Sequence, residues 1–151
     1  MTYRPRRLLL CLVALAVTQT AAHSYGLTLE DLALEPPSGC KTVGGEHPVS
    51  LQASMQYSAP SPKPERKTFQ SFHCSNHDST VYFFQYSADT DMKLAVLLAG
   101  ALVCGGPCPT SEHPERILTV ENILVVISSP KPKTFESAIT QKASRAREAT
   151  K

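Results

Sequence analysis

The sequence lacks the short motifs that mark several common classes of enzyme. It holds no Gly-x-Ser-x-Gly nucleophile elbow, no Cys-x-x-Cys redox pair and no glycine-rich phosphate loop. Three residues separate Cys104 from Cys108, which favours a small disulfide-closed turn over a thioredoxin-like site. We therefore expect a non-enzymatic protein, and a secreted enzyme that uses His73 or His77 is the weakest alternative.

The sequence also lacks an apolar run long enough to cross a membrane. Residues 8–17 form a ten-residue apolar run, whereas a spanning helix needs roughly 20 residues. Three arginines precede this run and small residues follow it, which is the order of a secretory signal peptide. We expect a signal peptide at residues 1–22 and an anchorless secreted chain, with cleavage after Ala22 or Ser24 fitting equally well.

Acceptor sites for N-linked glycans are missing as well. Asn76 and Asn122 are the only asparagines, and neither begins an Asn-x-Ser/Thr triplet. Solubility must then come from side chains or from a partner that covers apolar surface. Loss of the three leader arginines leaves 12 of the 15 basic residues against 13 acidic ones, so the charge indicates no nucleic-acid partner.

Four cysteines stay in the mature chain after the leader and its Cys11 are removed. An even number in a secreted protein predicts two disulfides, each worth about 2–4 kcal/mol. If Cys104 pairs with Cys108, then Cys40 pairs with Cys74 across a long proline-rich segment. The two crossed pairings are also possible, and the sequence does not choose among the three.

The hydrophobic pattern predicts an α+β fold with a small, mostly antiparallel sheet and one buried helix. Leucines at 27, 29, 32 and 34 fit either a short helix opened by Thr28 or an extended segment. We expect a helix at about 92–104, covered on most sides because it has few polar positions. Alternating or apolar runs predict strands at residues 49–58, at 79–87 and, as a strand pair or one long strand, at 116–128.

The charge pattern changes after this body of the chain. We assign the domain to residues 23–129 and a basic tail to residues 130–151. The tail has six basic against two acidic residues and low hydrophobicity, which favours a flexible, disordered segment. A helical turn around Phe135, Ile139 and Ala143 is the alternative.

The stretch FHCSNHDSTVYFFQYS places His73, Cys74 and His77 close together. A cysteine and a histidine three residues apart could share a tetrahedral zinc ion. The spacing matches no familiar zinc finger, however, and an oxidising compartment favours disulfides. We therefore expect Cys74 to form a disulfide, and we expect no metal or other cofactor.

Two segments resemble a known viral family. Residues 74–84, CSNHDSTVYFF, resemble a segment of gammaherpesvirus glycoprotein L in which a cysteine followed by x-Asn precedes an apolar strand. Downstream, ILTVENILVVISSPK and QKASRAREATK are similar to the apolar strand and basic tail that close some members. The chain departs from the family at Cys40, which has no closely spaced partner near the mature N-terminus, and in the CGGPC turn.

The resemblance implies a virion-envelope subunit with a specific large partner. Such a subunit binds envelope glycoprotein H, supports its folding and transport, and reaches the virion envelope and cell surface through it. The heterodimer then takes part in receptor binding and in activating the fusion protein, glycoprotein B. The competing hypothesis is a small secreted ligand or decoy whose disulfide-bonded core presents loops to a host receptor.

Strand addition to a partner's sheet is one binding mode open to the apolar segments. The residues that we expect to contact a partner in this way are Val81, Tyr82, Phe83, Phe84, Ile123, Leu124, Val125 and Val126.

Overall fold

Two apolar segments form the centre of a single sheet. The computed structural model describes residues 26–49, 61–100 and 115–149, and it places β3 (His77–Gln85) beside β5 (Ile123–Ser128). β3 carries β-branched and aromatic side chains and β5 carries β-branched ones, and both kinds pack well on a pleated surface. All six residues of β5 are buried, as the apolar run predicts for a central strand.

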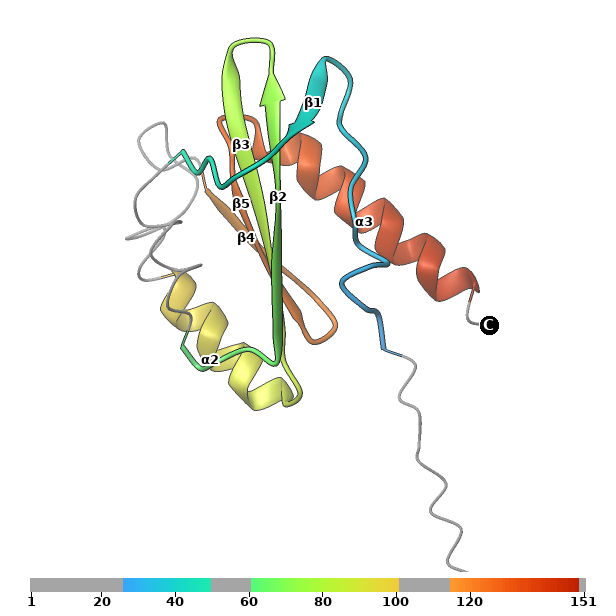
Figure 1. The fold of residues 1–151 in the computed structure, drawn as a ribbon. Helices are drawn as coiled ribbons and strands as arrows, with labels where there is room; N and C mark the ends of the chain where they lie inside the picture. The colour runs from blue at the N-terminus through green and yellow to red at the C-terminus, as the bar shows by residue number, and fades with distance from the viewer. Residues whose placement is uncertain (1–25, 50–60, 101–114, 150–151) are drawn as a thin grey trace, which may run out of the picture.

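The sheet has five antiparallel strands in the order β1-β2-β3-β5-β4 (Figure 1). The edge strands are β1 (Cys40–Val43) and β4 (Arg116–Val120), and β2 (Arg66–Cys74) lies between β1 and β3. With two helices on its faces, the fold is the expected α+β class with a mostly antiparallel sheet.

The strand predictions near the sheet centre are confirmed. The region 116–128 is a strand pair, β4 and β5, joined by a turn in which Glu121 has a φ of 54°. β1 and β2 were not predicted, because β1 is only four residues long and β2 begins with charged and polar residues. The strand predicted at 49–58 falls almost entirely outside the described residues.

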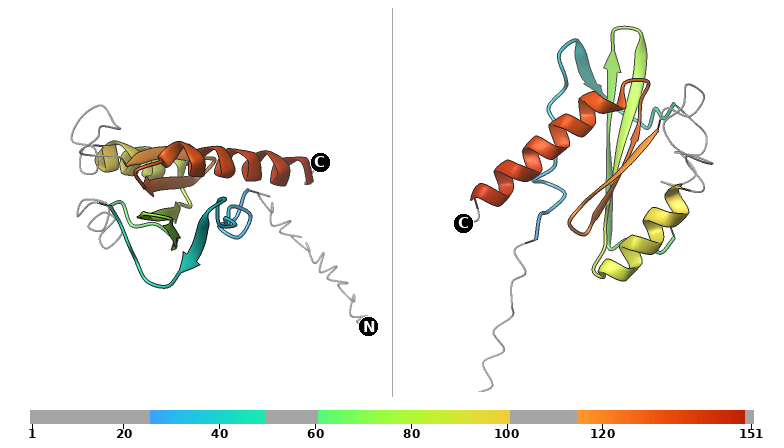
Figure 2. Two further views of the ribbon diagram at one scale, coloured as in Figure 1. Left: turned by 90° about the horizontal axis from the view of Figure 1, so that it is seen from above. Right: turned by 180° about the vertical axis from the view of Figure 1, so that it is seen from behind.

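Side chains that alternate along β3 and β5 divide the core into two layers. The first face of the sheet carries Val81, Phe83, Ile123, Val125 and Ile127, and the second carries Tyr82, Phe84, Leu124 and Val126. The view from above in Figure 2 shows helices α2 and α3 on opposite sides of the sheet.

The first face is covered by two segments from opposite ends of the described chain. Residues 27–34, here called the N-terminal clamp, bury Leu27, Leu29, Leu32 and Leu34 beside helix α3 (Pro132–Ala149). The clamp contains a turn at residues 29–32, where the Thr28 hydroxyl and amide donate to the Asp31 carboxylate. The segment forms neither the short helix nor a strand, so neither sequence alternative is confirmed.

The prediction of a disordered tail at residues 130–151 is wrong, because residues 132–149 form helix α3. Phe135, Ile139 and Ala143 recur every four residues and are buried against the first face. Low average hydrophobicity hid this stripe, since the other faces of the helix are polar. Packing of the stripe stabilises a helix that would be marginal alone.

The second face is covered by helix α2 (Asp89–Ala99) and by residues 44–49, here called the strap. Met92, Ala95 and Ala99 of α2 pack with Tyr82 and Phe84. Residues 101–104 of the predicted helix lie outside the described part.

The strap is held by polar contacts. The His47 amide donates to Thr80 Oγ1 at 3.0 Å, the Val49 amide donates to Ser128 Oγ at 2.8 Å, and the Tyr82 hydroxyl donates to Glu46 Oε1 at 2.8 Å.

A disulfide joins the first two strands. Cys40 and Cys74 are cross-strand neighbours in the register of β1 and β2, and their sulfur atoms are bonded. This is one of the three pairings that the sequence allowed. Cys104 and Cys108 lie outside the described residues, so their pairing stays a prediction. Within the described ranges, neither helix has the length and apolar character to cross a bilayer.

Candidate interaction surface

The eight residues expected to contact a partner lie in the core of the chain. Each is at most 1% exposed, and the set comprises Val81, Tyr82, Phe83, Phe84, Ile123, Leu124, Val125 and Val126. β3 pairs with β2 and β5, and β5 pairs with β3 and β4, so neither strand offers an edge. In the folded chain these residues stabilise the sheet and are not a contact surface. An apolar run is compatible both with a central strand covered by its own chain and with a strand covered by a partner. The sequence therefore did not show which of the two covers these residues.

At the end of the sheet beside β5, a partner strand could be added only along β4. Within the described residues, β4 pairs only with β5, so its other side is an edge. Ile117 and Leu118 are half-buried there, and Arg116 forms an ion pair with Glu136 of α3. Of the apolar residues 117–127, which we considered for strand addition, only the first four, residues 117–120, lie at this edge.

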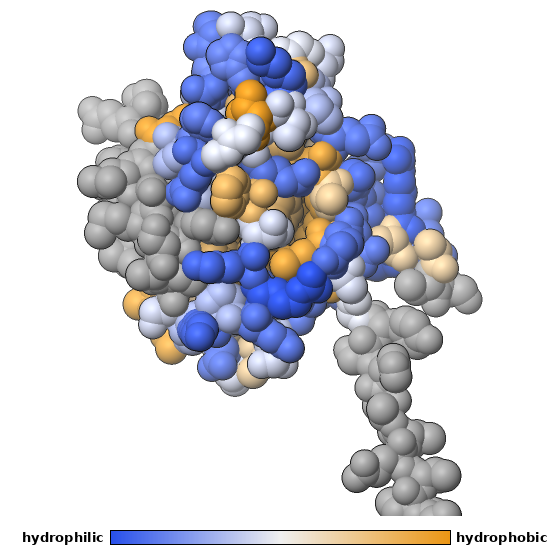
Figure 3. Space-filling view, viewed as in Figure 1, coloured by the Kyte–Doolittle hydropathy of each residue, from blue (hydrophilic) through white to orange (hydrophobic). Residues whose placement is uncertain are grey.

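Helix α2 carries its larger apolar side chains on the outside. Its buried side contains Met92, Ala95 and Ala99, whereas Leu94 is 48% exposed and Leu97 is 72% exposed. An ordinary surface helix buries its bulky residues and exposes polar ones. We call Leu94 and Leu97 the leucine ridge. The space-filling view shows small apolar areas among polar surface at the lower left, over α2 (Figure 3).

The sequence feature that corresponds to the leucine ridge is the low number of polar positions in this helix. A helix with so few polar positions was expected to be covered on most sides. The structure covers the side of the helix with Met92, Ala95 and Ala99, and it leaves Leu94 and Leu97, three positions apart, on the surface. Leu94 and Leu97 are therefore the functional candidates that the sequence reasoning missed.

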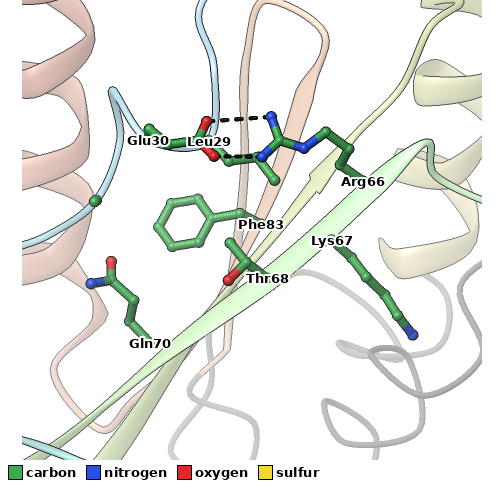
Figure 4. Close-up of a pocket in the computed structure, with 8 residues that line it drawn as sticks. Leu29, Glu30, Arg66, Lys67, Thr68, Gln70 and Phe83 are labelled. Atoms are coloured by element: carbon green, nitrogen blue, oxygen red, sulfur yellow. Dashed lines mark hydrogen bonds and ion pairs between the residues drawn. The ribbon is translucent and has the colours of Figure 1, made fainter.

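A pocket of about 360 Å³ lies between the N-terminal clamp and β2. Leu29, Ala33 and Phe83 supply its apolar part, and Thr68 and Gln70 approach it from β2 (Figure 4).

An ion pair lies at the rim of this pocket. Arg66 Nη1 donates to Glu30 Oε2 at 3.3 Å, and Arg66 Nη2 donates to Glu30 Oε1. The hydrogen bond from Arg66 is the main cause that lowers the pKa of Glu30 to about 2. The carboxylate is thus engaged as an ion-pair partner and is not poised as a general base. The pocket has a mixed lining, with apolar side chains from the clamp and β3 and polar or charged ones mainly from β2.

The histidines around Cys74 do not converge on a metal site. The Cys74 sulfur is bonded to Cys40, so it is no thiolate ligand. His73 Nδ1 lies 2.8 Å from Asp78 Oδ1, while His77 Nδ1 lies 3.2 Å from the side-chain oxygen of neighbouring Asn76. Among the residues that the structure describes, no group of three histidine, cysteine or acidic side chains is placed to hold a metal ion.

Within the described residues, the surface therefore offers an apolar ridge on α2, a strand edge at β4 and a pocket of mixed lining beside β2. Leu94 and Leu97 of the ridge are the large apolar side chains that this part of the chain exposes. No family model matches the chain, and neither a curated protein nor a solved structure matches it.

Proposed function

We propose that the chain is a secreted, non-enzymatic subunit of a viral envelope complex, similar to glycoprotein L, that binds an envelope glycoprotein H. In that role it supports folding and transport of the larger protein, and the heterodimer contributes to receptor binding and to membrane fusion during entry. Two features support the proposal. The segment resemblance at residues 74–84 includes Cys74, and Cys74 forms a disulfide as expected for a secreted chain.

The leucine ridge is the observation that carries the proposal. Two leucines, 48% and 72% exposed, lie on a helix whose opposite side is already packed on the sheet. Covering them would stabilise the complex by about 2–3 kcal/mol, or roughly 30- to 150-fold in affinity. Contiguous apolar patches rimmed by polar residues are the surfaces that mark protein contacts, and the ridge is a small patch of that kind.

The edge of β4 offers a second contact for the same partner. A strand of the larger glycoprotein could extend the sheet there through backbone hydrogen bonds. Backbone hydrogen bonds at the β4 edge would orient the partner strand, and burial of Leu94 and Leu97 would add apolar contact area. Interfaces of obligate partners combine large area with apolar character.

Co-expression with the virus's glycoprotein H tests the proposal. We expect the full-length chain to co-precipitate with glycoprotein H and to increase its amount at the cell surface. The double substitution L94E/L97E should reduce co-precipitation at least tenfold, because it places two charges in an apolar contact. The matched control S137E/Q141E, on the exposed face of α3, should bind normally.

Folding of the variants is checked by secretion and by the Cys40–Cys74 disulfide in unreduced peptide maps. If L94E/L97E is folded and binds as well as the parent protein, the ridge is not the interface. If the chain alone is a stable monomer that captures a host surface protein without glycoprotein H, the secreted-ligand hypothesis replaces this one.

A further inference from the structure

A second pocket, of about 200 Å³, lies against the disulfide, and we call it the disulfide pocket. Three segments enclose it, which are the turn at residues 37–39 before β1, the β2–β3 turn at residues 75–76 and the first turn of α3. Both Cys40 and Cys74 line it. The volume is that of several water molecules, so the sulfur end of a small molecule fits beside the bond.

The two sulfur atoms of the disulfide differ in their access to solvent. Cys74 is 5% exposed and belongs to the first core layer together with Phe72 and Phe135. Cys40 is half-buried and packs against the margin of that layer. A thiolate that attacks a disulfide bonds to one sulfur and expels the other. Access therefore favours attack at Cys40 Sγ, with Cys74 Sγ as the leaving group.

The charge of the disulfide pocket favours a negatively charged thiol. Lys131, which precedes the first residue of α3, lines the pocket, and the N-terminal end of the helix adds a partial positive charge. None of the described residues that line the pocket is acidic. The remaining polar side chains there are those of Ser38, Ser75, Asn76, His77 and Thr134. A nearby lysine attracts an anionic thiol and stabilises a sulfur atom that leaves as a thiolate.

The disulfide anchors a short strand that connects the covers of both core layers. Within the described residues, β1 pairs only with β2, along four residues. The chain runs from the N-terminal clamp on the first face through β1 to the strap on the second face. If the bond opens, this ladder alone holds the connection to the sheet, so the clamp and the strap are both loosened.

We propose that the Cys40–Cys74 disulfide is a thiol-exchange site, at which a small anionic thiol enters the disulfide pocket and forms a mixed disulfide with Cys40. The thiolate bonds to Cys40 Sγ, the bond to Cys74 breaks, and Cys74 leaves with the electron pair and takes a proton from water. A second thiol completes the reduction: its thiolate attacks the small thiol's sulfur in the mixed disulfide, Cys40 is released as a thiol, and the two small thiols leave as their oxidised dimer. The inference concerns this chain alone and does not depend on the proposed partner.

Exchange with the folded, full-length protein tests the inference, with 2-mercaptoethanesulfonate as the anionic thiol. Samples are quenched by alkylation, and peptide maps locate the adduct. We expect the adduct on Cys40 and an alkylated thiol on Cys74, and an adduct on Cys74 would contradict the assignment.

The dependence of the rate on urea shows whether the folded chain reacts. The rate should change less than about twofold up to about 1 M urea, whereas a bond that reacts only in unfolded molecules would react at least about fivefold faster. A rise of that size would overturn the inference, because the pocket would then give no access.

Two matched variants test the role of charge. K131Q removes the lysine that lines the pocket, and K133Q removes an exposed lysine of α3 that is not part of the lining. K131Q should slow the exchange about two- to fivefold, the effect of one exposed charge, and K133Q should react like the parent protein.

Cysteamine, a cationic thiol, provides the comparison of ligands. The rate of each thiol is divided by its rate with hydroxyethyl disulfide, which removes the difference in intrinsic reactivity. The parent protein should then prefer the anionic thiol, and K131Q should lose most of that preference. Equal corrected rates for the two thiols, or equal rates for K131Q and K133Q, would show that the pocket does not select an anionic thiol.

Discussion

The Tyr86 side chain places a buried hydroxyl in the core layer on the second face of the sheet. The residue is 1% exposed, and its hydroxyl has no hydrogen-bond partner within the described structure. Burial, and secondarily the negative charge of Asp91, raises the pKa of the hydroxyl to about 12. The folded chain therefore favours the neutral phenol more than the unfolded chain does.

Replacement of Tyr86 by phenylalanine should not destabilise the protein near neutral pH, and should stabilise it by up to about 1 kcal/mol, since an unsatisfied hydroxyl is removed. In the parent protein, this group's contribution to stability is complete below pH 10 and falls between about pH 10 and 12, as the unfolded chain ionises first.

Urea unfolding at pH 8 and at pH 11 measures both effects. Y86F should lose less stability than the parent protein between these two values. If the parent protein and Y86F lose the same free energy of unfolding between pH 8 and pH 11, ionisation of Tyr86 is not the cause of the loss.

At the scale of elements, helix α3 holds the first layer of the core together with the N-terminal clamp. Ile139 is fully buried among residues of the first face, while its neighbour Thr140 is exposed. The helix is therefore a structural part of the domain.

Substitution of Ile139 by alanine should lower the free energy of unfolding by about 2–4 kcal/mol through loss of burial and creation of a cavity. Thr140→Ala is the matched control and should stay within about 0.5 kcal/mol of the parent protein. Denaturant midpoints measure the difference. Equal midpoints for the two variants would mean that α3 is not docked in solution.

The sequence predicted elements well where the periodic signal was strong. The central strands could be read from TVYFF and ILVVI because β-branched and aromatic residues are dense there. β2 was missed because its pairing with β3, and not its own composition, makes it a strand. The alternative of a helical turn around Phe135, Ile139 and Ala143 placed the apolar stripe of helix α3 correctly but not its length, because only these few positions need to be apolar when a sheet already offers a surface to cover.

At the scale of the whole molecule, the site was less predictable than the fold. Periodicity identifies which residues are apolar, but it does not say whether a neighbouring element or a partner covers them. For this reason the residues expected to contact a partner lie in the core, and Leu94 and Leu97, in a helix expected to be covered on most sides, lie on the surface.

The disulfide restrains the molecule as a whole by closing a loop of 34 residues between Cys40 and Cys74. The C40S/C74S double variant should lose about 3–4 kcal/mol, chiefly because the unfolded chain gains freedom. Urea unfolding of the secreted protein measures this loss. An unchanged midpoint would contradict a stabilising role for the bond, and peptide maps of the same samples would show whether Cys104 pairs with Cys108.

The contacts of Glu121 bear on when the first core layer can fold during synthesis. Its carboxylate accepts one hydrogen bond from the Leu27 amide at 2.9 Å and another from Arg147 Nε at 3.1 Å, so it connects the N-terminal clamp to the last turns of α3. The first core layer is therefore incomplete during synthesis until residues near 147 have left the ribosome. Until then the leucines of the clamp have no cover from α3, and a chaperone would meet them exposed.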